Sequence, residues 1–212
     1  MCSGRVDLEF VFRAFLKGVD GVFIGGCKFD ECNYVTHGNY DAYALTQIGK
    51  NLLNHIGLNP KRLRADFMSG ADGNLLAEYT NDFSEQIKAL GPLGTSEGQD
   101  ADLLKIKLEA VRKLVPYLRL VERERLRVPE KSKQTYAEFF KGDDFNAFLD
   151  EIVSDKLAIS QILLLLKDKP LTTVEISTKL DLKPSDVSKF MISSSRHGMV
   201  RYDVASNCYS II

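Results

Sequence analysis

Long apolar runs are missing from this 212-residue sequence, and their absence excludes a membrane-spanning helix. The longest run, ILLLL at 162–166, is far shorter than the roughly 18–20 apolar residues that span a bilayer. The first residues also lack the apolar core of a secretory signal peptide. The cysteines number only four, which fits a reducing compartment better than a disulfide framework. We therefore expect a cytoplasmic protein with no membrane span.

An excess of either charge is missing as well. Lysine and arginine number 28 and the acidic residues 29, so the net charge is −1. No chain-wide basic field attracts nucleic acid or an anionic membrane. Catalytic patterns are also lacking, because no Ser/His/Asp or paired-carboxylate arrangement stands out. The glycines that end the apolar run 21–26 open a cysteine loop and not a dinucleotide-binding helix. We expect a chain with no catalytic site of its own.

The first part of the chain alternates between helical and strand patterns. We expect, in order, a helix, a strand, a helix, a strand and a helix over 8–16, 21–26, 43–56, 64–69 and 74–90. The run GVFIGG is short and apolar, which is typical of a strand buried in a parallel sheet. Strands that alternate with helices predict an α/β fold with a small doubly wound parallel sheet over residues 1–94.

The rest of the chain has a helical pattern. Residues 95–156 are predicted to form a charged helical linker region, which opens with the polar, glycine-bearing segment 93–102. Pro116 is expected to kink or break the long helix of this region, and the aromatic residues of 136–153 indicate short helices. From position 157, three helices followed by two short strands predict a winged helix-turn-helix domain over 157–212.

A winged helix raises the question of whether the chain binds DNA. Residues 157–212 contain seven basic and five acidic residues, so their net charge is +2. DNA-binding domains usually concentrate more basic side chains on the recognition helix and wing. This weak charge favours a protein-docking module, and we do not expect nucleic acid as a partner. A DNA-binding role nevertheless stays open as the alternative.

Three cysteines gather around the first predicted strand. Cys27 directly follows the apolar run and Cys32 lies in the same loop, whereas Cys2 precedes the first helix. Functional groups collect at the carboxyl ends of the strands in open α/β sheets, so we expect these thiols to converge on one sheet edge. Cys-x4-Cys is a ligand spacing of plant-type iron–sulfur proteins. Gly25 and Gly26 would let the backbone approach a cluster closely.

Spacing alone leaves three interpretations of these cysteines open: a metal site with three cysteine ligands, a redox dithiol, and inert packing. Zinc usually takes Cys-x2-Cys pairs, and a second such pair is absent. A 2Fe–2S cluster normally takes four protein ligands, so one ligand is unassigned. His37 is one candidate for the missing ligand, since imidazole is a ligand in Rieske centres. A histidine beside glycine in such a loop is, however, more often solvated or hydrogen-bonded than bound to a metal. Cys208 is interpreted as a small core residue of the last domain.

Two stretches carry a family resemblance, MCSGRVDLEFVFRAFLKGVDGVFIGGCKFDECNYVTHGNY and GLNPKRLRADFMSGADGNLLAE. Over about residues 1–94 the chain resembles the delta subunit of methyl-viologen-reducing hydrogenase. The Cys-Ser-Gly-Arg motif, the Gly-Cys-x4-Cys loop, Gly-Asn-Tyr and Pro-x-Arg-Leu-Arg follow in the family's order. Family members usually carry a further strand and a Cys-x-x-Cys segment before these motifs, and His-Pro-Gly-Asp where this loop has Lys-Phe-Asp-Glu. We expect a longer product or a partner chain to supply the missing groups.

The resemblance implies a function as well as a fold. It implies a 2Fe–2S electron-transfer subunit in which Cys2, Cys27 and Cys32 match the family's cysteines. Electrons would pass from a hydrogenase or formate dehydrogenase, through this cluster, to the flavin-bearing subunit of a heterodisulfide reductase-type complex in anaerobic metabolism such as methanogenesis. Two alternatives stay open: a redox-sensing winged-helix transcription regulator, and a structural adaptor without a cluster.

Overall fold

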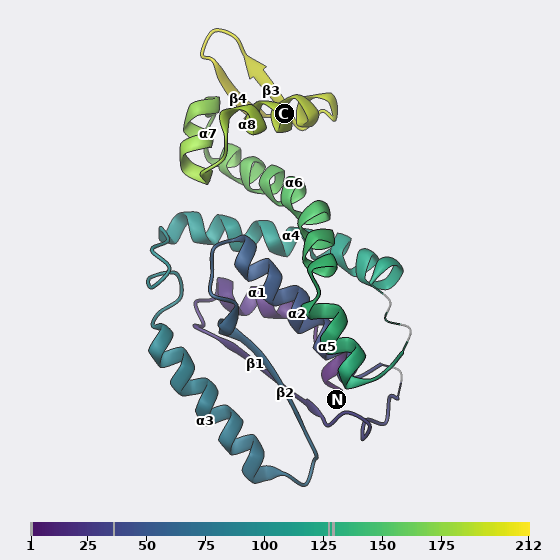
Figure 1. Ribbon diagram of the computed structural model, residues 1–212. Coiled ribbons are helices and arrows are strands. Elements are labelled where there is room, and N and C mark those ends of the chain that lie inside the picture. The colour runs from purple at the N-terminus through teal and green to yellow at the C-terminus, as the bar shows by residue number, and fades with distance from the viewer. Residues whose placement is uncertain (1, 36, 127, 129) are drawn as a thin grey trace.

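The computed structural model of the protein describes residues 2–35, 37–126, 128 and 130–212 (Figure 1). The elements of the first half are η1 (Ser3–Arg5), α1 (Leu8–Leu16), β1 (Val22–Cys27), α2 (Asn39–His55), η2 (Pro60–Arg62), β2 (Leu63–Met68) and α3 (Gly73–Leu90). Those of the second half are α4 (Ala101–Arg125), α5 (Lys133–Lys141), α6 (Asp143–Asp168), α7 (Thr173–Leu180), α8 (Pro184–Arg196), β3 (Val200–Asp203) and β4 (Cys208–Ile211). None of the described helices combines the length and the apolar character that a membrane span requires.

A two-stranded parallel sheet forms the centre of the N-terminal part. Strands β1 and β2 pair in register from Val22 opposite Leu63 to Cys27 opposite Met68. Figure 1 shows the sheet between α3 and the pair of helices α1 and α2, and all three helices contact it. The predicted mixed α/β class with a small parallel sheet is therefore confirmed for this part of the chain.

Helix α2 begins earlier than the sequence pattern predicts. The apolar periodicity indicates a start at position 43, whereas the helix already begins at Asn39. The backbone N–H of Ala42 donates a hydrogen bond of 3.0 Å to the carbonyl oxygen of Gly38, which lies directly before the helix. Gly38 has a φ of +63°, a backbone conformation that favours glycine. The helix therefore starts beside the loop that carries Cys32.

Helix α4 is continuous across Pro116, so of the predicted kink or break the break is wrong and the kink stays a prediction. A proline inside a helix removes one backbone hydrogen bond and costs roughly 3 kcal/mol. Its neighbours Leu114, Val115 and Leu118 are buried, and α4 packs against both α1 and α6. The burial of this apolar face outweighs the cost of the proline.

Helix α6 is longer than predicted. Short helices are expected over 136–153 and a new helix from Leu157, but α6 runs without interruption from Asp143 to Asp168. The sequence contains no glycine or proline between these two residues, so nothing ends the helix. The two hydrophobic clusters of the molecule meet on this helix, one reaching Leu157 and the other starting at Ala158. The boundaries of the three predicted domains stay predictions.

The polar segment 93–102 is tied to the first domain by Arg62, whose side chain is fully buried. Its Nη1 donates to the carbonyl oxygens of Asp20 at 3.0 Å and Gly91 at 2.9 Å. Its Nε lies 2.7 Å from a carboxylate oxygen of Glu97. Burial alone would raise the pKa of Glu97, but the bonds from Arg62 outweigh it and the pKa is lowered. The segment 93–102 is therefore held in a defined turn.

The C-terminal elements pack on the end of α6 (Figure 1). Helices α7 and α8 are followed by the antiparallel pair β3–β4, in the order that the sequence predicts. A capping box begins α7, in which the Thr172 side chain accepts from the backbone of Glu175 and the Glu175 side chain accepts from the backbone of Thr172. An isolated bridge joins Leu171 to Tyr209. The assignment of these elements as a winged helix stays a prediction.

Candidate functional site

Three of the four cysteines lie together at the carboxyl end of β1. Cys27 is the last residue of this strand, Cys32 lies in the loop that follows, and Cys2 directly precedes η1. A Cβ atom on Gly38 would lie 2.5 Å from Sγ of Cys32 and 3.4 Å from Sγ of Cys2. Cys27 interacts electrostatically with both of the other cysteines. The structure thus brings together the three residues that the sequence singles out.

The surroundings of the three thiols differ. Cys27 is exposed, Cys2 is half-buried and Cys32 is buried. The pKa of Cys27 is raised, by partial loss of solvation and then by the neighbouring charges of Cys32 and Cys2. Burial would raise the pKa of Cys32 as well, but hydrogen bonds from the backbone N–H groups of Tyr34 and Asn39 and from the two other thiols outweigh it and lower the pKa. The pKa values of Cys27 and Cys32 are therefore shifted in opposite directions, and the thiolate form is favoured at Cys32.

Close contact between two glycines holds Cys2 beside Cys32. A Cβ atom on Gly4 would lie 2.5 Å from the carbonyl oxygen of Gly38 and 2.7 Å from its Cα. Real Cβ atoms do not approach backbone so closely, so glycine alone fits this contact. The Cys-Ser-Gly-Arg motif and the glycine before α2 therefore pack backbone against backbone, and the thiols on either side of the contact meet.

Asn39 fixes the chain where it leaves β1. Its side chain is fully buried, and its Nδ2 donates to the carbonyl oxygens of Cys27 at 3.1 Å and Lys28 at 2.9 Å. Its Oδ1 and the Oγ of Ser3 are buried without a hydrogen-bond partner among the described residues. The Oγ of Ser3 lies 2.9 Å from the position of a Cβ atom on Gly26. Two unsatisfied polar atoms thus lie next to the cysteine-bearing segments.

The chemistry of this donor set suits a soft metal or an iron–sulfur cluster, which thiolates bind. The four cysteines are free thiols. Within the described ranges, no group of three or more His, Cys, Asp or Glu side chains has the arrangement of a preformed metal site. The thiol of Cys32 is hydrogen-bonded to those of Cys2 and Cys27 and to the backbone N–H groups of Tyr34 and Asn39. The donor chemistry of the three clustered thiols is that of a site for a thiolate-bound group.

The two other predicted candidates have different surroundings. The side chain of His37 is 74% exposed, and its Nδ1 lies 3.4 Å from a carboxylate oxygen of Asp41. Cys208 lies in β4, at the end of the molecule away from the N-terminus (Figure 1). Its Sγ donates to the carbonyl oxygen of Ser206 at 3.3 Å. Cys208 is therefore not part of the cysteine site.

Asn39 and Phe29 contribute to the site although neither is predicted from the sequence. Phe29 lies between Cys27 and Cys32 and is buried, with its ring 5.1 Å from that of Tyr40 and 4.6 Å from that of Phe67. A sequence signal exists for both residues. Phe29 is an apolar residue within a polar cysteine loop, and Asn39 is a polar residue in the first turn of an amphipathic helix.

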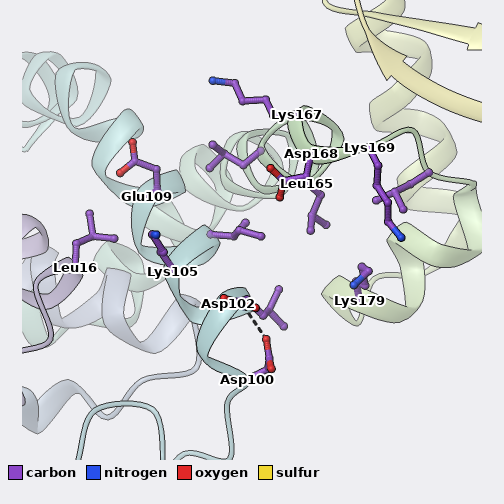
Figure 2. Close-up of a pocket in the computed structure, with 14 residues that line it drawn as sticks. Leu16, Asp100, Asp102, Lys105, Glu109, Leu165, Lys167, Asp168, Lys169 and Lys179 are labelled. Atoms are coloured by element: carbon purple, nitrogen blue, oxygen red, sulfur yellow. Dashed lines mark hydrogen bonds between the residues drawn. The ribbon is translucent and has the colours of Figure 1, made fainter.

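A separate groove of about 840 Å³ opens between α4, the end of α6 and α7 (Figure 2). Its apolar lining is edged by the lysines Lys105, Lys167, Lys169 and Lys179 and by the acidic residues Asp100, Asp102, Glu109 and Asp168. The balance of the two charges gives the groove no preference for an anion or a cation. None of its lining residues is a cysteine, so the groove is distinct from the cysteine site.

The sequence of the N-terminal part matches one protein family. The model of the methyl-viologen-reducing hydrogenase delta subunit matches residues 1–91. The iron-sulfur subunit of the vhu F420-non-reducing hydrogenase from Methanococcus maripaludis is 40% identical over 91 residues, which are 43% of this chain and 67% of that protein. This chain belongs to the methyl-viologen-reducing hydrogenase delta-subunit family. The predicted resemblance is confirmed.

Other relatives show where delta-subunit sequences occur. The F420-non-reducing hydrogenase iron-sulfur subunit of Archaeoglobus profundus is 41% identical over 91 residues, 43% of this chain and 66% of that protein. One subunit of the ferredoxin/F(420)H(2)-dependent CoB-CoM heterodisulfide reductase of Methanosarcina acetivorans is 43% identical over 100 residues, 47% of this chain. The chain spans only 12% of the length of that reductase subunit. The delta-subunit match contains the three clustered cysteines, whereas α4 to β4 lie beyond it.

Proposed function

We propose that this chain is an electron-transfer subunit that binds a 2Fe–2S cluster through Cys2, Cys27 and Cys32. The observation that carries the proposal is the meeting of these three thiols around Gly38, at the carboxyl end of β1. Membership of a family whose relatives are named iron-sulfur subunits supports it. The fourth ligand comes from outside the three-thiol cluster, from His37 or from another polypeptide.

The residues of this chain prepare the site for a negatively charged cluster. When bound, such a cluster accepts and releases single electrons. The backbone N–H groups of Tyr34 and Asn39 stabilise negative charge on the sulfur of Cys32. Asn39 also holds the carbonyl oxygens of Cys27 and Lys28, so that the loop keeps one shape. Hydrogen bonds to ligand sulfurs and burial are two of the factors that set a reduction potential.

We infer the partners from the names of the relatives. Iron-sulfur subunits of hydrogenases and one subunit of a heterodisulfide reductase are similar in sequence to the first part of this chain. The chain would take electrons from a hydrogenase or formate dehydrogenase and pass them to the flavin-bearing subunit of a heterodisulfide reductase-type complex. This role places it in the cytoplasm and gives it no catalytic site of its own.

For the C-terminal part we propose a winged helix that docks onto a partner protein. Its support is the order of α6, α7, α8 and the β3–β4 pair. Of the basic residues on α8, Lys189 lies 3.2 Å from Asp155 of α6 and is thereby partly neutralised. The full chain should therefore show no salt-dependent binding to a duplex in gel-shift experiments. Binding that weakens steeply with salt would favour the redox-sensing regulator instead.

Iron, acid-labile sulfide and EPR spectra after dithionite reduction test the cluster, measured on the anaerobically purified complex and on this chain alone. We expect about two irons per chain in the complex and a 2Fe–2S signal. Cys27→Ser and Cys32→Ser should each remove most of the iron, whereas Cys208→Ser is the matched control and should retain it. Iron in neither sample would refute the proposal, and the same iron content in all three variants would refute the ligand assignment.

A further inference from the structure

An aromatic wall covers the cysteine loop, and half of it comes from outside the delta-subunit match. The wall consists of Phe29, Tyr40, Tyr136 and Phe140, each no more than 7% exposed. Phe29 belongs to the loop between Cys27 and Cys32, and Tyr40 belongs to α2. Tyr136 and Phe140 belong to α5, which lies beyond the match to residues 1–91. Ring-centroid distances between successive members are 5.1, 4.8 and 5.9 Å.

Polar contacts reinforce the junction between the two halves of the wall. The hydroxyl of Tyr40 donates a hydrogen bond of 2.9 Å to the carbonyl oxygen of Lys131, in the turn before α5. The ammonium group of Lys131 lies 4.9 Å from the centre of the Tyr136 ring and donates to the Tyr136 hydroxyl. The turn thus holds both tyrosines, one through its backbone and the other through its side chain.

Tyr40 transmits this contact to the cysteines in two ways. Its ring packs on Phe29, which lies within the Cys-x4-Cys loop. It also directly follows Asn39, whose backbone N–H donates to the sulfur of Cys32 and whose side chain holds the end of β1. A shift of Tyr40 would therefore loosen the loop and the start of α2 together, on both sides of Cys32.

We propose that Tyr136 and Lys131 are positioning residues for the cysteine site, which keep Cys32 buried by holding Tyr40 against the cysteine loop. Both residues belong to a segment outside the delta-subunit match. The structural part of this proposal concerns this chain alone, and only its consequence for a bound cluster rests on the proposed function. In a loaded site, loosening the wall would admit water, which stabilises the more negative reduced form and shifts the reduction potential upward.

Alkylation of the cluster-free full chain tests the structural part. Iodoacetamide would be applied at low concentration, and the labelling rates of Cys32 and of the exposed Cys27 would be read by peptide mass spectrometry. Because Tyr136→Ala removes the ring contact with Tyr40 and the hydrogen bond from Lys131, it should raise the Cys32 rate relative to Cys27 by about tenfold. Tyr136→Phe keeps the ring and should restore most of the protection.

A matched control and a milder variant keep the test decisive. Tyr117→Ala removes a half-buried tyrosine of α4 that lies outside the wall, and it should leave the Cys32 rate unchanged. If Tyr136→Ala does not fold, Tyr40→Phe removes the hydroxyl that donates to Lys131 and that also interacts with Asp30 of the cysteine loop, and it should raise the rate about threefold. A Cys32 rate equal to that of the wild type in a folded Tyr136→Ala variant, or in Tyr40→Phe, would overturn the proposal.

The loaded protein gives a second readout that separates this proposal from the proposed function. If the wild-type complex contains the cluster, Tyr136→Ala should broaden its EPR signal and raise its midpoint potential, while Tyr136→Phe should restore both. If the wild type contains no iron, the proposed function fails, but the alkylation difference still reports on the wall. An unchanged spectrum and potential in loaded Tyr136→Ala would count against the positioning role.

Discussion

The two ends of the molecule are built by different means. The larger hydrophobic cluster surrounds α1, α2 and α4, whereas the smaller one joins the end of α6 to α7, α8 and β3. The larger part also buries Arg62 and Asn39 completely and packs Gly4 against Gly38. The smaller part has the residues that are usual at helix N-termini: a capping box at the start of α7 and Pro184 in the first turn of α8.

This difference shows that locally unfavourable features occur in the part of the chain that contains the candidate site. Buried charges and unsatisfied polar atoms destabilise a fold unless partners compensate them. In the N-terminal part the unsatisfied atoms of Ser3 and Asn39 lie beside the cysteines, and the buried Arg62 anchors the turn that follows α3. Among the described residues of the C-terminal part, Ser194 of α8 has such an atom. The departures from local rules therefore concentrate in the part that contains the candidate site. Four substitutions test this contrast, in order of decreasing expected effect.

Removing the buried arginine should have the largest effect. Arg62→Ala leaves the carboxylate of Glu97 buried without its partner, and breaking a buried ion pair in this way costs about 3–5 kcal/mol. The control is Arg119→Ala, because Arg119 is 51% exposed and pairs with Asp7 at the surface, where such a pair contributes less than about 1 kcal/mol. Urea denaturation measures both changes. Similar losses for the two variants would contradict the assigned role of Arg62.

The Glu97 contribution also has a defined pH dependence. Because its pKa in the folded protein is lowered, the stabilisation is complete above the unfolded-state value of about 4.3. It is lost as the pH falls through the lower folded-state pKa. The stability difference between the wild type and Arg62→Ala should therefore shrink in acid.

Neutralising a half-buried glutamate should stabilise the N-terminal part. Burial, and then the charges of Asp41 and Asp7, raise the pKa of Glu122 to about 7. The folded state then binds the proton more tightly, so stability falls as the pH rises from about 4.3 to about 7. Glu122→Gln should remove this loss and be more stable by roughly 2–3 kcal/mol at about pH 8, with little difference at about pH 4.

The exposed Glu124 on the same helix supplies the control for this prediction. Glu124→Gln should change stability by less than about 0.5 kcal/mol at either pH. Thermal unfolding followed by circular dichroism across the pH range measures both variants. A Glu122→Gln variant that is less stable than the wild type at alkaline pH would refute the assignment.

Adding one methyl group at the glycine contact should separate the motifs that carry Cys2 and Cys32. Gly4→Ala places a Cβ atom against the backbone of Gly38 and should cost about 1–3 kcal/mol. Gly73→Ala is the matched control, since nothing lies within 4 Å of the added atom. The control should be neutral or slightly stabilising. Equal unfolding midpoints for the two variants in urea would show that the contact tolerates a side chain.

The smallest effect is expected from the capping box of the C-terminal part. Thr172→Ala removes the side-chain oxygen that accepts from the N–H of Glu175 and should cost about 1 kcal/mol. Hydrogen exchange measured by mass spectrometry should show faster exchange in α7 and no change in α2. Faster exchange in both helices would mean that the two parts of the molecule open together, which would contradict the contrast between them.

Much of the fold follows from local patterns. The apolar run after Gly21 and the amphipathic periodicities predict β1, α1 and α3 to within a few residues. Cys27 is expected at the carboxyl end of a strand and lies there. The errors have tertiary causes: α4 passes through Pro116 because its buried face is held on both sides, and α2 starts early because Gly38 is held in place by Gly4.

Periodicity, glycines and cysteine spacing thus suffice to predict the parallel sheet, the sheet edge and the residues gathered there, because these features depend on near neighbours along the chain. The burial of Arg62 and the contact of Tyr136 with Tyr40 depend on segments far apart in the sequence. No local pattern encodes such contacts, since their free energy arises only when the segments pack together. Short sequence motifs therefore predict the cysteine site, whereas the aromatic wall that covers it forms only when distant segments pack together.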